Sequence, residues 1–280
     1  LFTDSAILGT WERRINEPIN AYTTIDTMNA GWAWQTDHED RVNRGYTYCS
    51  DFITREQAEE EFVERNPGIQ IMGHVGFTPG VYEKSWEKNV VAMGNATGFV
   101  EPLEATALWA LCDDCKSLME SIRLANGTVS PSLRAVYNRR SAGQWEGIRY
   151  NLGAHFKYNR RLSTPFWRRC QEEIDLGWAQ QIEDFYRENG PSLLFREDWV
   201  SPPVFFDVAD YLYMLVGQDV PYKTTWQISS RESQLWDKRK AHFRQRARAA
   251  MTAEEAIKIL RHPDYPWEQE FAPLQNSSPY

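Results

Sequence analysis

One stretch, Val90 to Ala107, constrains the fold of this chain more than any other part of its sequence. It begins with apolar and β-branched residues typical of a buried strand, continues through a turn with Gly94 and Gly98, and ends where a helix begins near Thr106. Glycine lets the backbone approach a ligand closely, and the amino end of a helix offers unpaired N–H groups and a positive dipole end. The pattern therefore predicts a corner that binds an anion or a cofactor.

Two registers are open for the start of this helix. In the first, Pro102 is the first helical residue and Glu104 is the capping-box carboxylate for the residue before Pro102. In the second, Thr106 caps the helix, so that the amides around Thr106 and Ala107 stay unpaired and form a pocket for a small anion. Glu104 then lies beside the anion, where its charge state affects function. The spacing of the residues alone favours neither register.

The sequence changes character at this corner. Residues 1–100 carry short β-branched or aromatic runs joined by Asn, Asp and Gly, as in an antiparallel meander, with one helix after the capping-box residue Thr54. Beyond Phe99, apolar residues recur every three or four positions, and we expect helices over 108–124, 132–160, 164–189, 207–216, 230–250 and 252–261. The sequence predicts an α+β fold with a sheet-rich part over 1–100, a helical part over 101–262 packed on it, and a Pro-rich tail over 263–280.

Composition excludes several classes of function. The net charge of −8 argues against a nucleic-acid partner, and without a run of eighteen apolar residues no membrane span is expected. The 12 Trp residues suit a core or a site for flat apolar ligands. Four scattered cysteines indicate a reducing cytoplasm, and Cys112 and Cys115 are interpreted as two helix residues rather than zinc ligands. No metal site is predicted, because consecutive side chains from Asp37 to Asp40 alternate between faces of a strand.

Read together, the segment from Gly94 to Ala107 and the run Gly31-Trp32-Ala33-Trp34 resemble the flavin-dependent halogenases usually called tryptophan halogenases. In that family the glycine-rich segment lies along the flavin, and a Pro-Leu-Glu-Ser/Ala-Thr-Gly stretch binds chloride through backbone amides and carries the catalytic Glu. Here Ala107 stands in place of the usual Gly. The resemblance implies a catalytic Glu104, flavin contacts at Gly94, Asn95, Ala96 and Gly98, halide contacts at Thr106 and Ala107, and substrate contacts at Trp32 and Trp34.

Family members also carry a G-x-G-x-x-G fingerprint for the dinucleotide and a Lys that handles hypochlorous acid, and this chain has neither at a matching position. We therefore expect the C-terminal part of a longer flavoprotein, inactive without the N-terminal FAD-binding half. The resemblance implies reduced FAD, chloride or bromide, a separate flavin reductase, and an electron-rich aromatic substrate whose identity the residues do not fix. Two rival hypotheses are a flavin monooxygenase that hydroxylates without halide, and a helical interaction module without chemistry of its own.

Overall fold

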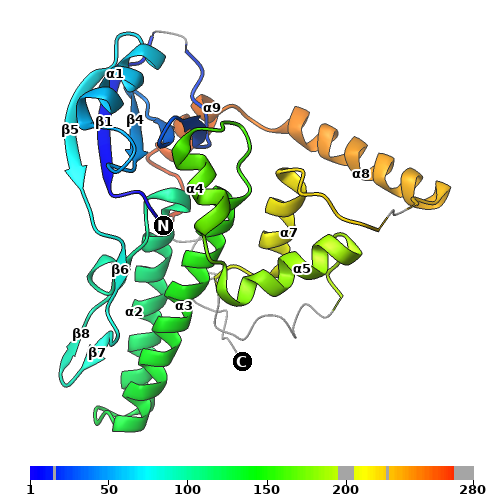
Figure 1. Ribbon diagram of the computed structural model, residues 1–280. Coiled ribbons are helices and arrows are strands. Elements are labelled where there is room, and N and C mark those ends of the chain that lie inside the picture. Colours follow the sequence, from blue (N-terminus) through cyan, green and yellow to red (C-terminus); the bar gives the residue numbers. More distant parts are fainter. Residues whose placement is uncertain (15–16, 195–204, 225–226, 268–280) are drawn as a thin grey trace. The chain divides into compact units, whose positions relative to one another are not determined.

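The computed structural model (Figure 1) describes residues 1–14, 17–194, 205–224 and 227–267. The chain divides into two compact units. Unit 1 comprises Leu1–Thr10, Ile25–Trp34 and Arg44–Trp226, and unit 2 comprises Trp11–Thr24, Gln35–Asn43 and Gln227–Tyr280. The division of the sequence at residue 100 stays a prediction, and most of the expected tail over 263–280 lies outside the described residues. No helix in the described ranges is long and apolar enough to cross a membrane.

The main sheet has five strands in the order β2-β3-β4-β1-β5. Its strands are β1 (Ser5–Glu12), β2 (Thr24–Met28), β3 (Gly31–Asp37), β4 (Arg41–Tyr48) and β5 (Gln70–Gly76). β5 pairs antiparallel with β1, with a register shift between Leu8 and Gly9. Helix α1 (Arg55–Arg65) begins at the predicted capping box of Thr54 and Gln57, and its Phe62 is buried in one cluster with sheet residues such as Tyr46.

The segment between the sheet and the long helices consists of short elements. They are β6 (Gly80–Val81), β7 (Trp86–Glu87), β8 (Val90–Val91), η1 (Gly94–Ala96), β9 (Gly98–Phe99) and η2 (Leu103–Ala105). The expected buried strand after Val90 is wrong, because β8 pairs only with β7 in a two-stranded hairpin and the Val90 side chain is 65% exposed. Trp86, rather than Val90, anchors this hairpin, with its ring packed edge-on against Tyr137.

Helices make up most of the remaining described chain. Unit 1 contains α2 (Thr106–Leu124), α3 (Pro131–Lys157), α4 (Pro165–Glu173), η3 (Gly177–Ala179), α5 (Gln180–Asn189) and α7 (Val208–Gly217). The long helices α2 and α3 lie side by side (Figure 1). The single helix expected over 164–189 is wrong, because Ile174 leaves helical geometry at ψ 118°. Gly177 then has φ +51° directly beside the Tyr150 ring, where a Cβ atom would clash.

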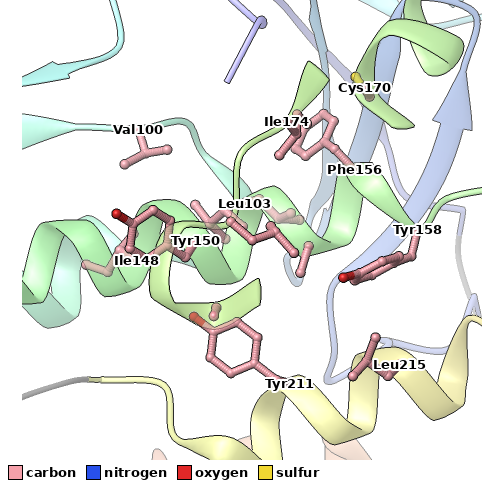
Figure 2. Close-up of a cluster of buried hydrophobic side chains, with 14 of the residues drawn as sticks. Val100, Leu103, Ile148, Tyr150, Phe156, Tyr158, Cys170, Ile174, Tyr211 and Leu215 are labelled. Carbon is pink, nitrogen blue, oxygen red and sulfur yellow. The ribbon is translucent and has the colours of Figure 1, made fainter. Parts of the chain in front are cut away.

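A large aromatic and aliphatic core holds the helices of unit 1 together. Figure 2 shows Leu103 in this cluster with Ile148 and Phe156 of α3 and Leu215 of α7. Leu103 is the only residue of η2 that is buried. The short segment that leads into α2 is therefore fixed to the core by one side chain.

Unit 2 contains the last two helices that the structure describes, α8 (Ser230–Ala249) and α9 (Ala253–Leu260). Both begin at capping boxes close to the predicted positions. α9 is tied to its unit by Glu254, which accepts a hydrogen bond from the Ile19 amide at 2.9 Å. No residue of α8 is buried, so its Arg and Lys side chains are exposed to solvent, and so are its apolar residues Trp236 and Phe243.

Candidate functional site

The segment from Glu101 to Leu108 forms part of the wall of two cavities in unit 1. A cavity of about 380 Å³ is lined by Glu101, Pro102, Ala105, Ala107 and Leu108, together with residues 93, 95, 96, 99 and 111. A second cavity, of about 650 Å³, is lined by Leu103 from the same segment. We refer to these as the smaller and the larger cavity. The stretch that the sequence singles out therefore lies between two spaces of ligand size.

The backbone at the start of α2 differs from both predicted registers. Pro102 does not begin the helix, and Thr106 is its first residue rather than its cap. Glu104 (φ 62°, ψ 4°) and Ala105 (φ 50°, ψ 29°) both adopt the left-handed conformation, which costs roughly 1–2 kcal/mol for a residue with a Cβ atom. Ala105 occupies the cap position and its methyl group cannot accept a hydrogen bond. The first amides of α2 therefore lack a side-chain cap, and Ala105 and Ala107 beside them line the smaller cavity.

Glu104 is paired with a histidine from the far end of α3. Its Oε1 lies 3.6 Å from Nε2 of His155, and 46% of the Glu104 side chain is exposed. A hydrogen bond from His155 lowers the pKa of Glu104 below its usual value. Glu104 is therefore a half-exposed carboxylate that stays ionised in mildly acidic solution, beside the start of α2, which no side chain caps.

Glu101, which the sequence analysis passed over, is the buried acid of this site. Its Oε2 accepts hydrogen bonds from Trp32 Nε1 at 3.0 Å and from Thr3 Oγ1 at 3.2 Å, and its Oε1 accepts one from the Leu103 amide at 3.2 Å. Burial raises the pKa of Glu101 to about 7, against the smaller effect of these three donors. The signal in the sequence is a single carboxylate enclosed by apolar residues, Val100 before it and Pro102-Leu103 after it.

The two candidate substrate residues occupy different environments. Trp32 lines the larger cavity, whereas Trp34 does not. Their rings lie 5.7 Å apart, and the Trp34 ring covers Gly45 so closely that a Cβ atom there would meet it at 2.1 Å. The structure thus gives Trp32 a position at a cavity and Trp34 a position in packing. Other side chains at the larger cavity, absent from the sequence-based set, come from His155, Phe156, Tyr158, Arg160, Arg161 and Trp167.

The candidate flavin residues also separate into two groups. Asn95 and Ala96 line the smaller cavity, but Gly94 and Gly98 do not. Gly94 has φ +53° and donates its amide hydrogen to Asp114 Oδ2 at 3.0 Å. A Cβ atom on Gly98 would lie 3.1 Å from the Trp145 ring. At both glycines the close approach is to protein atoms, so the need for glycine follows from packing.

Among the candidate halide residues, only Ala107 reaches the smaller cavity. Thr106 is buried, with 2% of its surface exposed, and it is not among the residues that line the cavity. Ala107 is half-buried and lines the cavity. In the described part of the chain, no group of three or more His, Cys, Asp or Glu side chains is placed to hold a metal ion.

Comparison with known proteins identifies the family. The family model described as "Tryptophan halogenase" matches residues 1–232, and the chain belongs to this family. An uncharacterized protein of Sinorhizobium fredii, y4xG, is 32% identical over 220 residues, covering 72% of this chain and 42% of the relative. Tryptophan 7-halogenase RebH of Lentzea aerocolonigenes is 30% identical over 172 residues, covering 60% of this chain and 32% of RebH.

The solved structures agree on the fold. MibH, a lanthipeptide tryptophan 5-halogenase, matches with a TM-score of 0.81 and 29% identity over 92% of this chain and 50% of MibH. The α+β fold predicted from the sequence is confirmed by this match and by the sheet followed by helices. The chain spans less than half the length of the two curated relatives and half the length of MibH.

Proposed function

We propose that this chain supplies one wall of the flavin site, the halide site and much of the substrate site of a flavin-dependent halogenase that chlorinates or brominates an electron-rich aromatic ring. The observation that carries the proposal is the uncapped start of α2 beside the smaller cavity, with Glu104 next to it and the larger cavity on the same wall. A site of this kind brings together an anion, a carboxylate and an aromatic substrate within one short segment.

The smaller cavity fits one face of a flavin ring. Its walls are mostly apolar, with Met93, Ala96, Pro102 and Leu108 among them, and such surfaces suit a flat heteroaromatic ring. The sequence has no Gly-x-Gly pair anywhere, so a dinucleotide fingerprint for the phosphates must come from another part of the protein. The residues present therefore fit the ring of the cofactor rather than its phosphates.

The exposed face of α2 supports a second, flavin-binding part that covers it. Leu108 and Leu111 lie three positions apart, as do Met119 and Ile122, and the exposed Cys115 lies four positions from both Leu111 and Met119. The four apolar side chains are exposed: Leu108 (68%), Leu111 (39%), Met119 (72%) and Ile122 (46%). A continuous apolar stripe on a helix is normally buried against a partner. Leu108 and Leu111 also line the smaller cavity, so a partner on this stripe would close the flavin site as well.

The first-turn amides of α2 are the donors that would hold chloride or bromide. The positive end of the helix dipole favours an anion there, while a charged Glu101 in the same cavity opposes it. Because burial raises the pKa of Glu101 to about 7, this carboxyl is neutral in acidic solution. Halide affinity should therefore fall as the pH rises through 7.

Reduced FAD, when bound, supplies together with O2 the oxidising power that converts halide into an electrophilic halogen. The residues of this chain would orient the substrate and move a proton. Trp32, Phe156 and Trp167 offer aromatic surfaces to a ring in the larger cavity. Glu104 is the candidate base that takes the proton which the ring gives up on halogenation.

The cellular setting completes the proposal. All four cysteines are free thiols, with Cys112 and Cys115 exposed on α2, which is typical of a reducing compartment such as the cytoplasm. A separate flavin reductase would deliver the reduced cofactor there. Residues 1–100 and 101–262 are proposed to act as one incomplete flavoprotein unit rather than as separate enzymes.

The test uses the intact protein with reduced FAD, O2 and bromide and a panel of indoles, pyrroles and phenols. Product carrying the paired bromine isotopes in mass spectrometry supports the proposal, and Glu104→Gln should remove it while FAD binding remains. Glu60→Gln, at an exposed residue on α1, is the matched control and should keep full activity. Unchanged turnover of the Glu104 variant would exclude Glu104 from the mechanism.

Hydroxylation without halide is the second candidate, and Ala107 is the observation that favours it. The methyl group of Ala107 replaces a hydrogen atom of the family's usual Gly, so the space for a halide beside the start of α2 is smaller. An oxygenated product in the same assay, with no brominated one, would overturn the halogenase proposal in favour of a monooxygenase. If FAD binds tightly to this chain alone, the requirement for a second flavin-binding part is wrong.

A further inference from the structure

His155 has both ring nitrogens occupied by protein groups. Nδ1 lies 3.1 Å from the carbonyl oxygen of Asn151, one turn earlier in α3. A carbonyl oxygen only accepts hydrogen bonds, so Nδ1 carries the hydrogen in this contact. Nε2 is then the nitrogen that faces Oε1 of Glu104, at 3.6 Å. The Asn151 carbonyl thus decides which nitrogen meets the carboxylate.

The contact between His155 and Glu104 needs one proton to be attractive. Neither the lone pair of a neutral Nε2 nor an ionised carboxylate has a hydrogen to donate, so an attractive contact requires a proton on one of them. The pKa of Glu104 is lowered, and its side-chain hydrogen bond to His155 is the largest cause. His155 also has a small electrostatic effect on the buried Glu101, whose pKa it lowers.

The pair has one member at the larger cavity and one outside its lining. The His155 ring lines the cavity, and Glu104 is not among the lining residues. Because neither nitrogen of His155 is free, the histidine cannot itself take a proton from a substrate without breaking a contact. Glu104 Oε2, in contrast, has no hydrogen-bond partner among the described residues, and the Glu104 side chain is 46% exposed.

We propose that His155 is a positioning residue for Glu104: Nε2–H holds Oε1 in place, which leaves Oε2 to accept the ring proton. This inference rests on the proposed function. The step is a proton transfer in which the electrons of the ring C–H bond return to the ring and the proton forms an O–H bond on Glu104. Glu104 then loses that proton to water and regains its charge.

The first test reads Glu104 directly and needs no turnover. The carboxyl carbon of Glu104 is followed by NMR against pH in the protein labelled with ¹³C-Glu, and Glu104→Gln assigns the signal. In wild type the titration midpoint should lie below the ordinary value of 4.5. His155→Leu should raise it to that value or above, because burial of Glu104 raises its pKa, and His155→Gln, which retains a neutral N–H donor, should raise it by less.

A second histidine–carboxylate pair in the chain provides the matched control. His74 Nε2 lies 2.9 Å from Glu59 Oε2, and His74 Nδ1 contacts Arg55. His74→Leu should leave the Glu104 titration unchanged. If His155→Leu also leaves it unchanged, the proposal is overturned. Ring ¹⁵N shifts that show no hydrogen on Nε2 of His155 while Glu104 is ionised would overturn it as well.

Activity gives an independent readout. If the intact protein halogenates, the acidic limb of its kcat against pH should move to higher pH in His155→Leu and by less in His155→Gln, because Glu104 must be ionised to act. A purely structural role would lower kcat at every pH without moving that limb, and would refute the proposal. A shifted NMR titration in a protein that gives no halogenated product would uphold the pair and refute the proposed function instead.

Discussion

Replacing Glu101 by glutamine should change how the stability of the protein depends on pH. In the folded state burial raises the pKa of Glu101 from 4.5 to about 7. Below 4.5 both folded and unfolded chains hold the proton, so the group has no effect. Between 4.5 and 7 the folded chain holds a proton that the unfolded chain has lost, and raising the pH therefore destabilises the fold.

The magnitude follows from the size of the shift. A shift from 4.5 to about 7 corresponds to about 3.5 kcal/mol of unfolding free energy, at about 1.4 kcal/mol for each pH unit. Wild type should lose this amount between pH 4.5 and pH 8 relative to the variant. In the glutamine variant the side-chain NH₂ group can face the Leu103 amide, which then loses its acceptor. The free-energy cost of that lost hydrogen bond does not depend on pH.

The assay is urea unfolding followed by Trp fluorescence at several pH values, with the midpoint and slope giving the free energy at each pH. Only the difference between Glu101→Gln and wild type is used, so that histidines and other titrating groups cancel. Glu60→Gln, at an exposed carboxylate, should show no pH-dependent difference. If the difference for Glu101→Gln is constant from pH 4.5 to 8, Glu101 is ionised in the folded protein and the reasoning fails.

Three further variants test the fold around the site. Ala105→Gly should stabilise the protein by about 1 kcal/mol, because glycine adopts the left-handed cap conformation without strain, and a lower urea midpoint would contradict this. Gly31→Ala should cost about 1–3 kcal/mol, since its Cβ atom would lie 1.9 Å from the Thr47 carbonyl oxygen, and an unchanged melting temperature would show that β3 can move away. Thr54→Ala removes the cap of α1 and should cost about 1 kcal/mol, with faster amide exchange confined to the first turn of α1; exchange spread across the sheet would indicate a different cause.

Elements whose determinants are local could be predicted from the sequence. The capping box at Thr54 gave the start of α1, and α8 and α9 begin close to the predicted residues because Ser229 and Thr252 cap them. The break after α4 could not be predicted in this way. It depends on the burial of Ile174 and on the Tyr150 ring beside Gly177, and both contacts come from α3 or the core around it.

The candidate site shows the same division. The importance of the segment from Glu101 to Ala107 was visible in the sequence, but the left-handed backbone at Glu104 and Ala105 was not, because residues with a Cβ atom seldom adopt it. The role of Glu101 depends on Thr3 and Trp32, which are far away in the sequence. Burial of a carboxyl and its hydrogen bonds to distant side chains depend on the three-dimensional fold. A sequence motif shows only which residue is present, not what surrounds it.

The hydrogen bond between Trp32 and Glu101 links ligand binding in one cavity to ligand binding in the other. The indole forms part of the wall of the larger cavity, and the carboxyl that it holds forms part of the wall of the smaller one. A molecule that turns the indole away from the carboxyl also changes how readily that carboxyl gives up its proton. An anion in the smaller cavity that favours the protonated form of Glu101 would in the same way change the affinity of a ligand bound against Trp32. By thermodynamic reciprocity, each of the two ligands changes the affinity of the other by the same factor.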